Sequence, residues 1–139
     1  MKEADEKEPI KAGFVYLAPA NYHLLVEPDK TVGLSVDPRV CYSRPSIDAL
    51  FETAAEVYQA GLIGVVLTGA SHDGTAGLRK VKEKGGLSLA QDPATGEAEV
   101  MPLSAIRGKV VDKVLPLAEI AAFLKQMASK GRLEKKPGF

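Results

Sequence analysis

One carboxylate stands out among the residues that could do chemistry, because Asp73 follows an apolar run and precedes a helical pattern. The run 62–67 is typical of a buried strand in a parallel sheet, and the Gly-rich segment 68–74 is typical of a loop. In open α/β sheets, ligands and catalytic groups gather outside the carboxyl ends of such strands. The pattern therefore predicts a site at this loop, with Asp73 as its first candidate residue. The other residues of this loop are Thr68, Gly69, Ala70, Ser71, His72 and Gly74.

Asp73 also has a simpler interpretation as a helix cap. The free N–H groups and the positive end of a helix dipole favour a carboxylate at that position. Residue spacing alone favours the cap over a catalytic role, since Asp-Gly pairs are common in turns. Ser71, His72 and Asp73 are a poor hydrolase triad, because the serine and the carboxylate must approach opposite nitrogens of the imidazole. We therefore interpret His72 as a solvated loop residue.

Other candidate residues have structural interpretations that we prefer. His23 is interpreted as a partly buried strand residue, and Ser88 as the interior of a strand, since no second glycine completes a nucleophile elbow. Arg44 precedes a helix start and could bind a substrate carboxylate, but fastening its loop to the domain is slightly favoured. A cluster of basic residues in the second helix is interpreted as a solvated face. Its members are Arg79, Lys80, Lys82 and Lys84.

Composition limits the classes of partner. The chain has 139 residues, enough for one domain with a sizeable core. Its 18 basic residues balance 18 acidic ones, so no net charge attracts nucleic acid or an anionic membrane. A single cysteine, Cys41, is incompatible with internal disulfides, and no run is long enough to span a membrane. These features predict a cytoplasmic protein without membrane insertion.

The elements that must position the loop are predicted from periodicity and from Gly, Pro and cap residues. The predicted strands are 13–19, 23–27, 31–36, 62–67, 87–90 and 110–115, with 23–36 forming a β-hairpin. The first predicted helix, 47–58, has Ser46 as its cap and ends before Gly61. The second, 75–84, ends before Gly85 and Gly86. A short helix opened by Pro102 and a final helix from 117 follow, with 131–139 as a frayed tail. This order predicts a doubly wound, mostly parallel α/β sheet with helices on both faces and a β-hairpin.

The loop itself carries a family resemblance. Its sequence T-G-A-S-H-D-G-T-A-G-L at 68–78 resembles the aspartate loop of the CheB-type chemotaxis protein-glutamate methylesterases. Further segments resemble the same family in the same order, so the resemblance covers about residues 9–124. These segments are G-F-V-Y-L-A-P at 13–19, R-P-S-I-D-A-L-F at 44–51, Gly85-Gly86, A-Q-D-P-A at 90–94 and Met101-Pro102.

The resemblance implies a serine hydrolase that removes methyl esters from glutamates on the cytoplasmic domain of chemoreceptors, with some members deamidating receptor glutamines. In such enzymes a serine attacks the carbonyl, a histidine takes the serine proton, and an aspartate orients the histidine. Asp73 matches that aspartate, while Thr68, Gly69 and Ala70 match residues that line the pocket. The resemblance implies neither a cofactor nor a metal.

The sequence departs from the family pattern at the serine and the histidine. In the family both lie upstream of the matched region, and neither motif occurs here. We therefore expect residues 1–139 to form a single domain that lacks its N-terminal βαβ portion, and thus an incomplete three-layer domain. Such a sheet would expose an unpaired edge and apolar surface, to be covered by a partner.

Three hypotheses remain open from the sequence. The chain is a truncated methylesterase that is inactive in isolation, with Asp73 as the one triad member present. Alternatively, it is a receptor-binding or regulatory module, or one part of a split enzyme whose serine and histidine come from another chain. The third hypothesis is a small-anion-binding α/β domain that uses the loop at 69–74, although the loop lacks the Gly-Lys-Ser/Thr of a phosphate loop.

Overall fold

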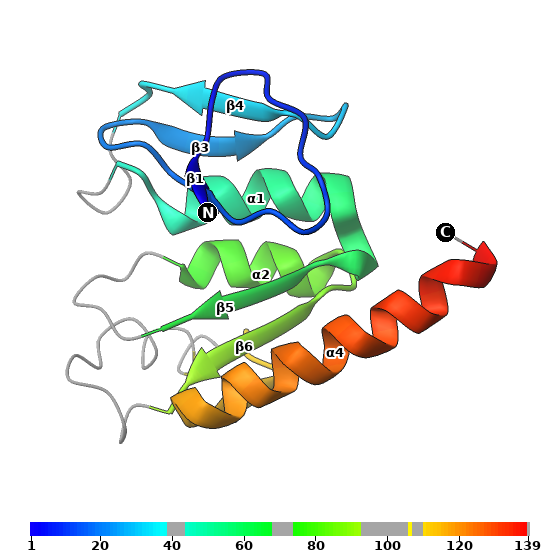
Figure 1. The fold of residues 1–139 in the computed structure, drawn as a ribbon. Coiled ribbons are helices and arrows are strands. Elements are labelled where there is room, and N and C mark those ends of the chain that lie inside the picture. Colours follow the sequence, from blue (N-terminus) through cyan, green and yellow to red (C-terminus); the bar gives the residue numbers. More distant parts are fainter. Residues whose placement is uncertain (39–43, 68–73, 93–105, 107–109, 139) are drawn as a thin grey trace.

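A three-stranded parallel sheet lies at the centre of the computed structural model, which describes residues 1–38, 44–67, 74–92, 106 and 110–138, with side chains to residue 128 (Figure 1). Its strands are β5 (Ile63–Val66), β6 (Leu87–Gln91) and β7 (Lys113–Leu115), in the order β5-β6-β7. Val66 pairs with Ala90, and Leu89 pairs with Lys113. The predicted strands at 62–67, 87–90 and 110–115 are thus confirmed, the last one in a shorter form.

Two helices precede and follow β5. Helix α1 (Ile47–Tyr58) begins at Ser46, whose Oγ accepts the Ala49 N–H at 3.3 Å, as the cap prediction required. It ends at Gln59, and a short 3₁₀ turn η1 (Gln59–Gly61) leads into β5. Helix α2 (Thr75–Glu83) follows the loop, and Gly85 at φ +88° turns the chain back into β6. The predicted βαβ unit is confirmed, because β5 and β6 are parallel neighbours joined by α2.

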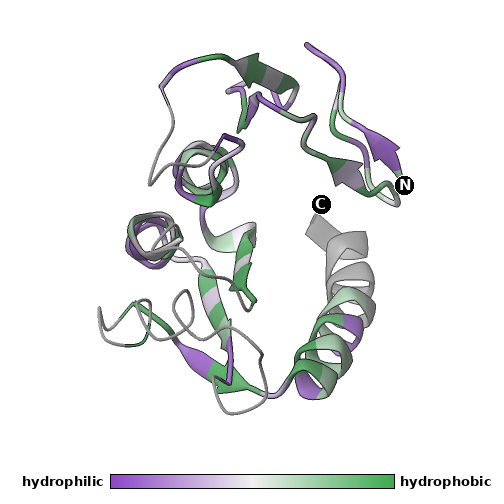
Figure 2. Cartoon of the chain, turned by 90° about the vertical axis from the view of Figure 1, so that its left-hand side faces the viewer, coloured by the Kyte–Doolittle hydropathy of each residue, from purple (hydrophilic) through white to green (hydrophobic). Residues whose placement is uncertain are grey.

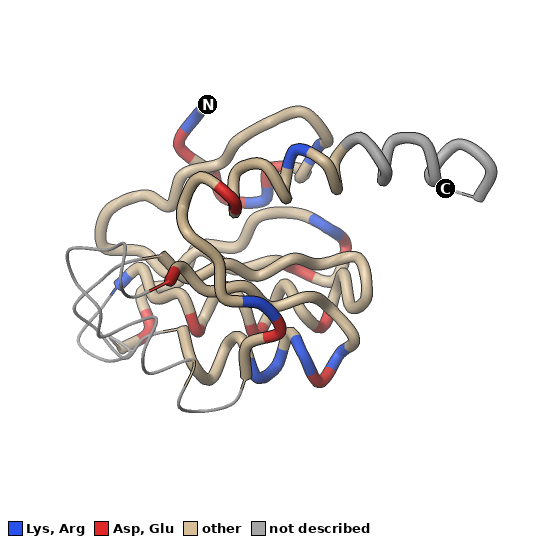
Figure 3. The backbone as a smooth tube through the Cα atoms, turned by 90° about the horizontal axis from the view of Figure 1, so that it is seen from below, with Lys and Arg blue, Asp and Glu red and all other residues tan. Residues whose placement is uncertain are grey.

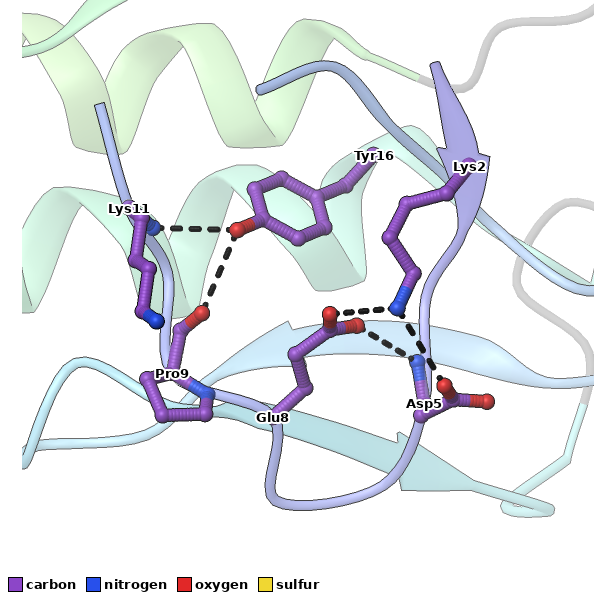
Figure 4. A network of polar contacts seen from close by, with 6 residues as sticks. All are labelled: Lys2, Asp5, Glu8, Pro9, Lys11 and Tyr16. Atoms are coloured by element: carbon purple, nitrogen blue, oxygen red, sulfur yellow. Dashed lines mark hydrogen bonds and ion pairs between the residues drawn. The ribbon is translucent and has the colours of Figure 1, made fainter. Parts of the chain in front are cut away.

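The predicted hairpin forms from β3 (His23–Val26) and β4 (Val32–Ser35), which pair antiparallel. The predicted strand 13–19 reduces to β2 (Tyr16–Leu17), which pairs in parallel with β1 (Lys2–Glu3). Strand β1 was not predicted, because both of its residues are charged and have no strand pattern. Polar contacts hold the connection between β1 and β2 (Figure 4): Glu8 accepts from the Lys2 ammonium and the Asp5 N–H, and the Tyr16 hydroxyl accepts the Lys11 N–H.

Helices cover both faces of the central sheet, as predicted. Helices α1 and α2 lie on one side, and α4 (Leu117–Gly138) lies on the other (Figures 1 and 2). The helix α4 includes the segment 131–138, for which a frayed end is predicted. Terminal turns open at almost no free-energy cost, so fraying in solution stays a prediction. The helix opened by Pro102 lies outside the described residues.

Two apolar clusters lie within the described core. One joins the central sheet to α2 and includes Val66, Leu78, Ala90 and Val110, with Ile47 and Phe51 of α1 packed against it. The other lies beneath the hairpin and includes Ala4, Leu24 and Val32, with Leu50 of α1 packed against it. Helix α1 therefore contributes to both clusters from different sides.

Charged residues of both signs are interspersed along the described part of the chain (Figure 3). The basic cluster of α2 lies on the surface, as predicted, with Arg79 and Lys82 exposed, and Lys80 and Lys84 lie 2.7 and 3.5 Å from the Glu56 carboxylate on α1. The hydrogen bond from Lys80 lowers the pKa of Glu56. None of the helices in the described residues has the length and apolar character needed to cross a bilayer.

Ser88 connects β6 to the segment before β7, which confirms its structural interpretation. Its hydroxyl donates to Val110 O at 2.6 Å, and Asp112 Oδ2 accepts the Ser88 N–H at 2.9 Å. Lys82 of α2 lies 3.3 Å from the other carboxylate oxygen of Asp112. The Ser88 backbone N–H is the main cause of a lowered pKa at Asp112, and the Ser88 hydroxyl and Lys82 act in the same direction.

The lowered pKa of Asp112 predicts a pH dependence of stability. The contribution of the ionised Asp112 carboxylate to the free energy of unfolding should be complete above pH 3.8, its ordinary pKa. That contribution should disappear as the pH falls through the lower pKa that Asp112 has in the folded protein. Urea unfolding of the wild type and of Asp112→Asn between pH 7 and about pH 2 measures this contribution. The difference in unfolding free energy should be largest near neutral pH and shrink in acid. A difference that is constant across this range would contradict the prediction.

Candidate active site

The candidate loop joins the carboxyl end of β5 to the amino end of α2. The structure describes β5 to Val66, the half-exposed Leu67 after it, and the chain again from Gly74. Gly74 is the one predicted loop residue that the structure describes. The other predicted residues, Asp73 included, lie outside the described residues. They are Thr68, Gly69, Ala70, Ser71, His72 and Asp73.

Gly74 is the N-cap residue of α2, with φ 110° and ψ −25°. This left-handed conformation strongly favours glycine, because a Cβ would be strained there. As a glycine, the cap residue has no side chain that could bond to the first turn of the helix. The N-cap position is thus one residue after Asp73, whose own interpretation as a helix cap lies outside the described residues.

A different carboxylate occupies the amino end of α2. Asp48, in the first turn of α1, is only 6% exposed, and its Oδ1 accepts hydrogen bonds from the Gly74 and Gly77 N–H groups at 2.9 and 2.7 Å. These donors are among those that a helix leaves without an internal partner at its start. A negative charge at this end is also favoured by the helix dipole. Asp48 is thus the described side chain most closely tied to the site.

Sequence reasoning missed this role of Asp48. Its position in the first turn of α1 is where acidic residues are generally favoured, so the local pattern has a sufficient explanation. The bond to Gly74 spans 26 residues and depends on how α1 packs on α2. Gly77 could have indicated a close approach of another element to α2, because a glycine inside a helix often allows another backbone to approach.

Gly77 allows α1 and α2 to approach closely. A Cβ built at Gly77 would lie 2.7 Å from the Phe51 Cβ and 3.1 Å from the Asp48 Cα and Oδ1. Any larger side chain would therefore push α1 away from the helix that it supports. The short distance from Asp48 to the Gly77 N–H depends on this missing side chain.

His23 has a structural role in the fold. It lies on β3 and is 2% exposed, which confirms its interpretation as a strand residue and shows deeper burial than predicted. Its Nδ1 accepts the Ser46 N–H at 3.2 Å, so Nε2 carries the proton and donates to Pro38 O at 3.0 Å. Both ring nitrogens are engaged, and His23 is therefore unsuited to act as a general base.

Arg44 fastens the segment before α1 to the end of the hairpin. Its Nη1 donates to Val36 O at 3.0 Å and to Asp37 O at 3.4 Å. The Nε atom is buried and makes no hydrogen bond with the described residues. The fastening role is confirmed by these contacts, whereas contact between Arg44 and a substrate stays a prediction. The described residues contain no group of three His, Cys, Asp or Glu side chains that could hold a metal ion.

Fold comparison defines the class of protein. The chain matches the crystal structure of the Thermotoga maritima CheB methylesterase catalytic domain with a TM-score of 0.85 and 38% identity. The match covers 90% of this chain and 68% of that one. The parallel sheet and its helices thus belong to a CheB-type catalytic fold.

Sequence comparison identifies the family. The family model for CheB methylesterase matches residues 1–124, and the chain belongs to the CheB methylesterase family. A Leptospira interrogans protein, provisionally named a protein-glutamate methylesterase/protein-glutamine glutaminase, is 61% identical over 121 residues. The protein-glutamate methylesterase FrzG of Myxococcus xanthus is 40% identical over 124 residues. These matches cover 87% and 89% of this chain, but only 63% and 37% of the two relatives.

Proposed function

We propose that this chain is the Asp73-bearing part of a hydrolase that demethylates glutamate methyl esters on chemoreceptors and deamidates receptor glutamines. The observation that carries the proposal is the family match over residues 1–124, which includes the sequence between β5 and α2 that resembles the family's aspartate loop at Asp73. The chain spans 63% of the length of the Leptospira relative, so we propose the activity of a whole methylesterase and do not transfer it from that relative.

The proposed chemistry is acyl transfer to a serine, followed by hydrolysis. The serine oxygen attacks the ester carbonyl while the histidine takes its proton, and methanol leaves as the acyl-enzyme forms. Water then releases the glutamate carboxylate. Asp73 orients the histidine and stabilises its charged form. The serine and the histidine come from sequence outside these 139 residues, in the same chain or in another one.

The partners that we propose are the cytoplasmic domain of a methylated chemoreceptor and the segment that supplies the serine and the histidine. Within the described residues, β5 pairs with β6 on one side and with no strand on the other. An open strand edge and exposed apolar side chains are typical of surfaces that another polypeptide covers. Large exposed apolar residues include Phe14, Val15, Leu17, Leu117 and Leu124. We further propose that the protein acts in the cytoplasm, where these receptor domains lie.

Methanol release from a methylated receptor fragment tests the proposal. The assay is run with this chain alone, and then with the part of the Leptospira relative that this chain does not match added as a second polypeptide. We expect no release by the chain alone and release by the mixture. Asp73→Asn should reduce the rate of the mixture by about four orders of magnitude, as loss of a triad aspartate does elsewhere. Glu52→Gln, an exposed carboxylate on α1, is the control and should leave the rate unchanged.

The outcomes separate the remaining hypotheses. Release by the chain alone that Asp73→Asn abolishes would place a complete triad within these residues, and our assignment of the serine and the histidine would be wrong. No release by the mixture, together with binding of the receptor fragment, would favour a receptor-binding module.

The anion-binding hypothesis is disfavoured by Asp48. Its carboxylate already accepts the Gly74 and Gly77 N–H groups, which are the donors that a bound phosphate would need at this helix end. A ligand that binds the folded protein raises its midpoint of thermal unfolding. We expect phosphate and nucleotides to leave that midpoint unchanged, and a concentration-dependent rise would restore this hypothesis.

A further inference from the structure

We propose that Arg44 is a specificity residue that binds a carboxylate of the receptor segment through the Nε–Nη2 edge of its guanidinium group. Binding of a carboxylate at this edge can be tested without any enzymatic activity. Only the assignment of that carboxylate to a chemoreceptor rests on the proposed function.

The first observation is a buried donor of Arg44 that lacks an acceptor among the described residues. Its Nη1 donates to Val36 O at 3.0 Å and to Asp37 O at 3.4 Å, whereas its Nε is buried and makes no such bond. An arginine stays charged at every pH at which proteins fold, so Nε always carries a hydrogen. A buried donor without an acceptor costs free energy, and a ligand that accepts its hydrogen bond removes that cost.

The second observation is the edge of the guanidinium group that these contacts leave. The group is planar, and the N–H groups of Nε and Nη2 point in parallel, which matches the two oxygens of a carboxylate. The bonds to Val36 and Asp37 both come from Nη1, so they hold the plane of the group and leave the Nε–Nη2 edge. Both residues are exposed, so the guanidinium group lies close to the surface. A donor edge that is held before binding loses less conformational freedom when a ligand arrives.

The third observation is the charge of Arg44. The ion pairs found among the described residues join lysines to carboxylates, and none of them includes Arg44. The described acceptors of Arg44 are backbone carbonyls, which carry no net charge. An anion is therefore the complement of this side chain. A carboxylate fits best, because demethylation and deamidation both leave a glutamate carboxylate on the receptor segment.

Arg44 also lies at the end of the molecule where a ligand is expected. It precedes Ser46, the N-cap of α1, and β5 and β6 both point toward the end at which α1 and α2 begin (Figure 1). The Asp48 carboxylate joins these two helix starts by accepting the Gly74 N–H at 2.9 Å. Ligands of open α/β sheets bind outside the carboxyl ends of the strands. The position of Arg44 therefore agrees with contact to a bound substrate segment.

The wild type and two variants of the full chain test the proposal. Arg44→Lys keeps the charge and a donor for Val36 O but lacks the planar fork. Arg79→Lys makes the same change at an exposed arginine of α2 and is the matched control. Because Arg44→Lys also alters the bonds to Val36 and Asp37, each variant is first checked for cooperative unfolding, and the measurements are made where it is folded.

The first measurement is nuclear magnetic resonance of the arginine Nε–H groups of the wild type during titration with three peptides. One peptide has a glutamate methyl ester between two glutamates, the second has that ester between two glutamines, and the third has a free glutamate between two glutamines. We expect a saturable shift of the Arg44 Nε–H signal with the first or the third peptide, none with the second, and no shift of the Arg79 signal. A shift with the first peptide alone assigns the site to an acidic neighbour of the ester, and a shift with the third assigns it to the product carboxylate.

The affinity of each variant for the peptide that shifts the signal completes the binding test. Fluorescence anisotropy of the labelled peptide measures it. Arg44→Lys should weaken binding roughly 10–100-fold, the range for losing a hydrogen bond to a charged group, and Arg79→Lys should leave it unchanged. No shift of the Arg44 signal with any peptide, or an equal shift with the second, would overturn the proposal, because Arg44 would then serve only the fold. If Arg44→Lys does not fold, the wild-type titration alone decides.

The second measurement is methanol release by the reconstituted mixture, per folded molecule. For a site that binds an acidic neighbour of the ester, Arg44→Lys should raise KM for the first peptide about 10-fold and leave kcat within about twofold, since such a contact is equal in the ground and transition states. For a site that binds the product, Arg44→Lys should weaken inhibition by the third peptide about 10-fold. Neither change would overturn the role of Arg44 in specificity. If the wild-type mixture releases no methanol, the proposed function fails, while the Arg44 Nε–H signal still decides whether Arg44 binds a carboxylate.

Discussion

Replacing Leu78 with alanine is expected to lower the free energy of unfolding by about 2–5 kcal/mol, the usual cost of removing a buried leucine side chain. Leu78 is fully buried on α2 and packs with Val66, Ala90 and Val110. Its Cδ2 also lies 3.0 Å from where a Cβ on Gly64 of β5 would be, so helix and sheet are in close contact there. The cavity left by the truncation would lie between α2 and the central sheet.

Urea unfolding at neutral pH measures this effect, with a shift in midpoint and an unchanged slope as the expected result. Leu117→Ala is the matched control, because Leu117 is 52% exposed at the start of α4. Its effect should stay within about 1 kcal/mol. A loss below that value for Leu78→Ala would mean that the contact between α2 and the sheet contributes little to stability.

Gly77→Ala is expected to destabilise the protein by about 1–3 kcal/mol, the range for forcing extra atoms into a packed core. The direction is informative, because the same change in an exposed helix should stabilise it by about 1 kcal/mol. The new methyl group would lie 2.7 Å from the Phe51 Cβ and 3.1 Å from the Asp48 backbone, so α1 would have to move.

Thermal unfolding of Gly77→Ala and of a control separates crowding from propensity. Gly61→Ala is the control, since a Cβ at Gly61 would meet no atom within 4 Å. We expect a lower midpoint for Gly77→Ala and a nearly unchanged one for Gly61→Ala. Gly77→Ala should also speed amide exchange at Gly74, because moving α1 carries the Asp48 carboxylate away. A higher midpoint for Gly77→Ala would show that α1 yields at little cost.

The sequence predicted well the elements that local patterns define. The βαβ unit from β5 through α2 to β6, the hairpin of β3 and β4, and the Ser46 cap of α1 all follow from periodicity, turn residues and cap residues. The parallel pairing of β1 with β2 could not be predicted, because two-residue strands leave no periodic signal. Gly74 is the N-cap of α2, and the interpretation of Asp73 as a cap lies outside the described residues.

The strand, loop and helix pattern predicts where the candidate site lies, and the structure confirms the strand and the helix that flank the loop. The site itself stays a prediction, as does the assignment of Asp73, which came from the family resemblance. The Asp48 bond to Gly74 was not predictable, because it joins residues of two helices whose packing is a tertiary property. A lone aspartate in the first turn of a helix has many uses, and its sequence does not distinguish them.

Helix α1 has a mechanical consequence for the whole described structure. Leu50 packs beneath the hairpin, Phe51 packs beside α2, and the Thr53 hydroxyl accepts the Val26 N–H of β3 at 2.9 Å. The amino-terminal strands and the βαβ unit thus pack on opposite sides of the same helix, and unfolding of either one would expose one side of α1. A single proteolytic cut in the turn between β3 and β4 would therefore weaken the support of α1 and, through Asp48, the hydrogen bond to Gly74 on the other side.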